Sequence, residues 1–131
     1  MDKIHGLKRH FPGSFDEAIA AIPLALKSQG FGILTEIDVQ STLKAKLGAD
    51  FRRYRILGAC NPPFALQALE ADIDAGLMLP CNVIVYEGDD GGVVIMAVDP
   101  NATVASTGNP SLVALAGTVR EKLLLALDAL V

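Results

Sequence analysis

Two apolar runs joined by a short turn constrain the fold more than any other part of this sequence. Residues 81–87 and 93–98 have the composition of β-strands, and residues 88–92 between them are Gly and Asp residues typical of a turn. The two runs therefore predict an antiparallel hairpin. Val and Ile fall on both faces of this hairpin, so we expect each face to be covered by another part of the chain or by a partner.

Cap residues, prolines and apolar spacing predict the other elements. The remaining predicted strands are 3–11, 32–39 and 51–59. The predicted helices are 14–30, 38–47, 61–73 and 110–131. Residues 99–109 are predicted to form a loop. We therefore expect an α+β fold in a single compact domain, 1–131, with a mainly antiparallel sheet, packed helices and the order β-α-β-α-β-α-β-β-α.

The last helix, 110–131, is apolar nearly all the way round. Leu124 and Leu125 widen its apolar surface, and such a helix is buried on more than one side. Together with the two-sided hairpin, this helix predicts a homodimer. A charge introduced at Leu124 or Leu125 is then expected to give monomers or insoluble protein.

Composition and charge exclude several partners. Hydrophobic residues make up 51% of the 131 residues, yet no run approaches the roughly 18 apolar residues of a membrane helix. The net charge is −4, and no Lys or Arg occurs between Ile56 and Val119. We therefore expect neither a nucleic acid nor a membrane as partner. Basic residues gather in 3–9 and 44–55, which form either an anion-binding patch or solvated surface.

The start of the chain and the cysteine content indicate the compartment. Residues 1–10 carry charges and no apolar core of a signal peptide. Two cysteines fit the reducing cytoplasm better than a secreted disulfide scaffold. We therefore expect a cytoplasmic protein.

Three segments together resemble a known family. They are 54–62 (YRILGACNP), 79–86 (LPCNVIVY) and the pair Asp99-Pro100. They are similar to the prokaryotic domain-of-unknown-function family 302, and the resemblance covers nearly the whole chain. It implies a compact α+β domain with helices packed on an antiparallel sheet, often dimeric. It implies no activity, so it identifies no catalytic residue and no cofactor, and whether the chain is an enzyme stays open.

Two Cys-Asn pairs at strand ends are the candidate site. Cys60-Asn61 ends one predicted strand before a helix, and Cys81-Asn82 begins another. Asn61 is explained by helix capping, whereas Asn82 is an amide in an apolar strand and should need a partner. Because pockets form at strand ends, we predict a small-molecule pocket near Tyr54, Cys60, Asn61, Cys81 and Asn82.

Two alternatives to a ligand pocket remain open. A helix N-terminus favours a thiolate at Cys60, so Cys60 and Cys81 could form a redox pair or a soft-metal site. His5 and His10 are further conceivable ligands, and a dimer axis could bring four thiols together. Alternatively, both cysteines are small buried packing residues, and the chain is a structural or interaction domain.

Overall fold

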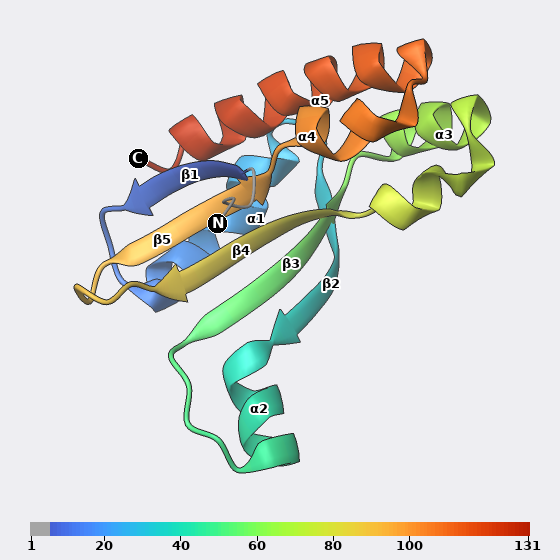
Figure 1. Cartoon of the computed structure of the whole chain (residues 1–131). Helices are drawn as coiled ribbons and strands as arrows, with labels where there is room; N and C mark the ends of the chain where they lie inside the picture. Colours follow the sequence, from blue (N-terminus) through green and yellow to red (C-terminus); the bar gives the residue numbers. More distant parts are fainter. Residues whose placement is uncertain (1–5) are drawn as a thin grey trace.

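The computed structural model describes residues 6–131, which form an α+β fold built on a five-stranded antiparallel sheet (Figure 1). The strands are β1 (Gly6–Phe11), β2 (Gly32–Asp38), β3 (Tyr54–Cys60), β4 (Cys81–Glu87) and β5 (Val93–Val98). Their order across the sheet is β1-β5-β4-β3-β2. The predicted hairpin is confirmed as β4 and β5, with Val83 opposite Ala97.

Helices connect the strands in the predicted order. They are α1 (Phe15–Lys27), α2 (Val39–Leu47), α3 (Pro62–Ala71), α4 (Pro100–Val104) and α5 (Pro110–Asp128). Two short 3₁₀ helices, η1 (Ile73–Met78) and η2 (Ala105–Thr107), follow α3 and α4. Within residues 6–131, no helix has the length and apolar content needed to cross a membrane.

The main core lies between one face of the sheet and the helices α1 and α5. Leu57, Val83 and Ile95 project from that face, and each is at most 2% exposed. Ile22 of α1 and Leu123 of α5 pack against them and are fully buried. Each such side chain stabilises the fold by about 1.5–3 kcal/mol relative to an exposed one.

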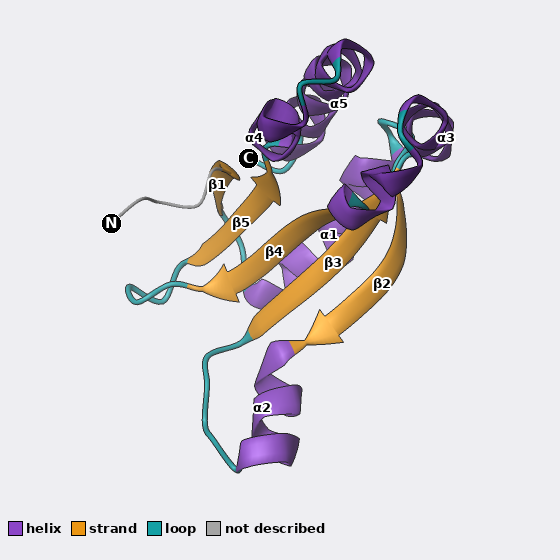
Figure 2. Ribbon diagram, turned by 45° about the vertical axis from the view of Figure 1, so that its right-hand side comes forward, coloured by secondary structure: helices purple, strands orange, loops and turns teal. Residues whose placement is uncertain are grey.

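The other face of the sheet is covered by none of the helices in the described part of the chain (Figure 2). Residues alternate between faces along a strand, so this second face carries Ile56, Ile84 and Met96 on three adjacent strands. The prediction that both hairpin faces are apolar is therefore confirmed. The chain itself supplies a helical layer for only one of them.

The capping signals in the sequence act as predicted. Ser14 Oγ accepts a hydrogen bond from Glu17 N, and Glu17 Oε1 accepts one from Ser14 N, both at 3.1 Å. This is the capping box of α1, which continues through Pro23. Asp38 caps α2 through Ser41 N at 3.0 Å, and Gly48 ends α2 in the left-handed conformation.

The prediction of a loop over 99–109 is wrong, because α4 and η2 lie within it. Asp99 Oδ1 accepts a hydrogen bond from Asn101 N at 3.0 Å, and Pro100 occupies the first turn. This is the same combination of cap and proline that starts α5, where Asn109 is the cap. The helix is only five residues long, so it shows no apolar period.

The prediction of one helix over 61–73, with Ala65, Leu66, Leu69 and Ile73 as its apolar stripe, is only partly correct. Leu66 is 59% exposed and Ile73 is 80% exposed, whereas Ala68 is buried. The helix ends at Ala71, and Ile73 belongs to a 3₁₀ turn. The change of helical period between the two elements turns Ile73 away from the core.

Candidate functional site

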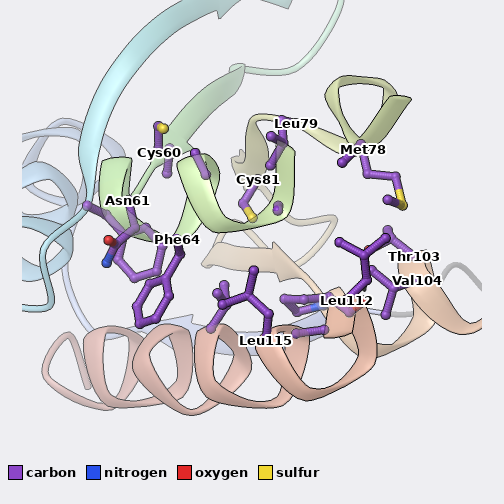
Figure 3. A pocket seen from close by; sticks show the side chains of 18 residues that line it. Cys60, Asn61, Phe64, Met78, Leu79, Cys81, Thr103, Val104, Leu112 and Leu115 are labelled. Atoms are coloured by element: carbon purple, nitrogen blue, oxygen red, sulfur yellow. Dashed lines mark hydrogen bonds between the residues drawn. The ribbon is translucent and has the colours of Figure 1, made fainter. Parts of the chain in front are cut away.

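A cavity of about 70 Å³ lies where α3, η1, α4 and α5 meet the ends of β3 and β4 (Figure 3). Phe64, Ala68, Met78, Leu112, Leu115 and Ala116 are among the side chains that line it. Small residues from facing helices leave the space, because alanine side chains cannot fill the gap between two helix backbones. The residues of η1 and α4 form the wall farthest from the sheet.

The cavity is lined almost entirely by apolar side chains. Only Cys60, Asn61, Cys81 and Thr103 bring polar groups to its wall, and no charged side chain lines it. Three of these four, Cys60, Asn61 and Cys81, are among the site residues predicted from the sequence. The structure therefore brings both residues of the first Cys-Asn pair to one cavity, together with Cys81 of the second pair.

Asn61 does not cap α3 with its side chain, contrary to the sequence-based interpretation. Its Nδ2 donates a hydrogen bond to the carbonyl oxygen of Gln29 at 3.2 Å. The bond ties the turn after α1 to the start of α3. Gly30, in that turn, has φ of 85°, and a Cβ there would lie 3.0 Å from Asn61 Nδ2. Asn61 is 9% exposed, and its Oδ1 accepts no hydrogen bond from residues 6–131.

Cys60 and Cys81 are neighbours in the sheet but point in opposite directions. Cys81 pairs with Ala59, so it projects from the same face as Ala59, while Cys60 projects from the other. Figure 3 shows the two sulfur atoms on opposite sides of the strand ends. Both residues are free thiols. This arrangement does not present the two sulfur atoms to one another for a disulfide.

The Cys81 thiol is held in its neutral form. Burial raises the pKa of Cys81 to about 11, and the neighbouring Cys60 adds to the rise. A thiol with this pKa carries very little thiolate at neutral pH. Cys81 therefore contributes an S–H group and apolar volume to the cavity wall.

Tyr54 and Asn82 lie outside the cavity. Tyr54 is at the opposite end of β3 from Cys60, and its ring stacks on Tyr86 with centroids 5.4 Å apart. Asn82 is exposed and pairs with Gly58, which places it on the uncovered face of the sheet. Because Asn82 is solvated, it does not need the buried partner that the sequence indicated.

The sequence reasoning missed the half of the cavity that α4 and α5 contribute. The sequence analysis placed Thr103 in a predicted loop, and it treated Leu112 and Ala116 as part of an ordinary apolar helix. The available signal was the recurrence of alanine at 65, 68, 75 and 116, all of which line the cavity.

A metal site finds no support among residues 6–131, where no group of three or more His, Cys, Asp or Glu side chains comes together. His10 is exposed on β1. His5 falls outside the described residues, as do Lys3 and the start of the predicted first strand.

Four of the five basic residues of 44–55 pair with acidic neighbours, and the fifth, Lys46, is exposed. Arg52 pairs with Asp89 and Arg53 with Asp16, both at 2.6 Å. Lys44 pairs with Asp50, and Arg55 pairs with Glu36 and Asp38. The segment is therefore a solvated surface of ion pairs, not an open anion site. Arg53 beside Asp16 also lowers the pKa of that carboxyl.

The sequence and the fold both match known proteins. The model of the family described as "Domain of unknown function DUF302" matches residues 7–130. The chain belongs to the DUF302 family. Its fold is similar to the crystal structure of an uncharacterized conserved DUF302 protein from Bacillus stearothermophilus, with a TM-score of 0.92 and 28% identity. That match covers 98% of this chain and 100% of the other.

No curated protein matches this DUF302 chain. The family resemblance read from residues 54–62, 79–86 and 99–100 is thus confirmed, and so is the α+β fold that it implied.

Proposed function

We propose that this DUF302 protein binds a small, neutral, mainly apolar ligand in the cavity between α3, η1, α4 and α5. The observation that carries the proposal is a cavity whose lining is almost entirely apolar, with Asn61 and Thr103 among its few polar residues. A neutral ligand with an apolar body and few polar groups matches that lining.

The charge around the cavity supports a neutral ligand. None of its lining residues is charged, and the segment 56–119, which supplies nearly all of them, contains no Lys or Arg. Arg120 lies just beyond that segment, and its Nε donates to Asp99 Oδ2 at 3.3 Å. A phosphate or carboxylate in the cavity would therefore meet no cationic side chain in its lining, and burying its charge there would cost a large desolvation free energy.

The size of the cavity limits the ligand. A water molecule takes about 30 Å³ in the liquid, so a cavity of about 70 Å³ accepts a group of only a few non-hydrogen atoms. A larger molecule fits only if the rest of it lies outside. The outer sides of α3 and η1 expose Leu66 and Leu77, with Leu77 93% exposed, and this apolar surface suits a longer alkyl ligand.

The rest of the proposal concerns the state of the protein in the cell. We place it in the cytoplasm as a homodimer, supported by its two free thiols and by the apolar sheet face that its helices leave uncovered. The redox and metal alternatives have less support, because the thiols diverge and Cys81 stays protonated.

The ligand proposal is tested with xenon, a probe small enough for apolar cavities. Amide chemical shifts of uniformly ¹⁵N-labelled protein are measured under xenon pressure. We expect changes confined to the lining residues, and we expect Ala116→Val to abolish them by filling the space. Ala114→Val is the matched control, because Ala114 is exposed on the same helix.

Native mass spectrometry then identifies what the protein carries from the cell. Untagged protein purified with mild reductant is expected to show extra mass that Ala116→Val lacks and Ala114→Val retains. Protein that shows neither extra mass nor xenon-dependent shifts contradicts the proposed ligand site.

A further inference from the structure

The uncovered face of the sheet is apolar at its centre. Ile56 pairs with Ile84, and Ile84 pairs with Met96, so the three side chains form a row across β3, β4 and β5. Beside that row lie the stacked rings of Tyr54 and Tyr86. All five side chains are partly exposed.

Helix α2 extends this surface beyond the end of the sheet. None of its residues is buried, and Leu47 at its end is 74% exposed. Phe51, in the segment that returns to β3, is 43% exposed and lies 6.2 Å from Tyr54 between ring centroids. The apolar surface therefore continues from the sheet onto the segment that follows α2, and Figure 1 shows α2 projecting away from the rest of the molecule.

We propose that a second copy of this chain covers the face, with the two sheets packed face to face about a two-fold axis. The inference names the interface of the homodimer proposed above and therefore rests on that homodimer. It also replaces α5 as the expected interface, because Leu124 packs against the core of its own chain.

The area of the face sets how much of the molecule must take part in such a dimer. Strands of about 6 residues, each rising about 3.3 Å, and a spacing of about 4.8 Å give five strands a flat area of roughly 450 Å². A stable interface buries about 800 Å² on each partner. The interface must therefore extend beyond the sheet, onto the exposed α2 and Phe51.

The charges on the face permit two copies to meet. By the alternation of side chains, none of the five strands in the described sheet presents a carboxylate on this face. The only Lys, Arg or His side chains that the described strands place there are Lys8 and His10, both on the edge strand β1. The other titratable groups on the face are the phenols of Tyr54 and Tyr86 and the thiol of Cys60. The centre of the interface would therefore bury no unpaired charge.

Charge also selects the direction of the two-fold axis. An axis across the strands would place β1 against β1 and bring Lys8 and His10 against the same residues of the other copy. An axis along the strands places β1 of one copy over β2 of the other. That second arrangement also brings α2, with Lys46, toward the turn that contains Asp90. Both lie at the same end of the sheet, α2 between β2 and β3 and the turn between β5 and the central strand β4. Opposite charges then meet, and we infer this arrangement.

Analytical ultracentrifugation of the wild type and two lysine variants tests the interface. Ile84→Lys places a charge at its centre, whereas Leu125→Lys makes the same kind of change on α5, where Leu125 is 57% exposed. We expect a wild-type dimer, at least roughly 30-fold weaker dimerisation for Ile84→Lys, and wild-type dimerisation for Leu125→Lys. Circular dichroism confirms that each variant is folded.

A pair of surface charge reversals tests the arrangement without touching the apolar centre. Lys46→Glu and Asp90→Lys are each expected to weaken dimerisation by about 2- to 30-fold, and the double variant is expected to restore it. Both residues are exposed, so both variants should fold even if Ile84→Lys does not.

The outcomes separate the interface from the dimer itself. A monomeric wild type overturns both. A wild-type dimer that Ile84→Lys leaves intact, or that Leu125→Lys dissociates, overturns the sheet-face interface and keeps the homodimer. A double charge reversal as weak as the single ones overturns the axis along the strands.

Discussion

Gly58 lies in β3 at a position where one methyl group has no room. A Cβ there would overlap Thr35 Oγ1 and would lie 2.8 Å from Cγ of Pro80. The Thr35 side chain is exposed and can rotate away, but the Pro80 ring is fixed to the backbone, so β3 would have to move. Overpacking of this kind costs about 1–3 kcal/mol, and the lost freedom of glycine in the unfolded chain offsets about 0.4–1 kcal/mol. We expect Gly58→Ala to lower the free energy of unfolding by about 1–2 kcal/mol.

Urea unfolding followed by far-ultraviolet circular dichroism measures this loss, since the chain has no Trp to report by fluorescence. Gly76→Ala is the matched control, because a Cβ at Gly76 would meet nothing within 4 Å. In a Thr35→Ala background, Gly58→Ala should lower the free energy of unfolding by less, because the clash with Thr35 Oγ1 is gone. The clash with the Pro80 ring should remain. A Gly58→Ala protein as stable as the wild type would refute the steric argument.

Two further predictions concern the cavity wall. The pKa of Cys81 is raised to about 11 from 9.0, so its contribution to stability is present below pH 9 and is lost as the pH rises toward 11. Urea unfolding at several pH values should therefore show a wild-type protein that loses roughly 2–3 kcal/mol more than Cys81→Ala over this range, and parallel profiles would contradict the burial of the thiol. Asn61→Ala removes the hydrogen bond to the Gln29 carbonyl and should cost about 1–3 kcal/mol in the same assay. Asn101 is exposed, so Asn101→Ala is the control. If both variants lose the same free energy of unfolding, the hydrogen bond from Asn61 to Gln29 does not stabilise the fold.

The fold was predictable because its signals are local. Gly and Asp residues at 88–92 defined the hairpin, and Ser14 with Glu17 defined the start of α1. Alternation along β3 places Tyr54 and Ile56 on one face, and their pairing with Tyr86 and Ile84 agrees with it. Each of these features depends on residues only a few positions apart, so each can be predicted from a short stretch of sequence.

The site was only partly predictable because it depends on packing between distant segments. Proximity to strand ends identified Cys60, Asn61 and Cys81, which line the cavity. The same reasoning included Tyr54, which lies at the far end of its strand, since the residues alone do not say which strand end meets α5. The hydrogen bond from Asn61 to Gln29 joins positions 32 residues apart, so no local sequence pattern predicts it.

The position of β1 sets a condition on how the chain is made. Gly6 of β1 pairs with Val98 of β5, and Arg9 bonds Asp128 at the end of α5 at 2.9 Å. β1 thus has its partners in β5, which is synthesised after the other described strands, and at the end of α5, which follows β5. A nascent chain keeps β1 unpaired until β5 has emerged. Loss of the last turn of α5 would then loosen β1, because Asp128 would no longer hold Arg9.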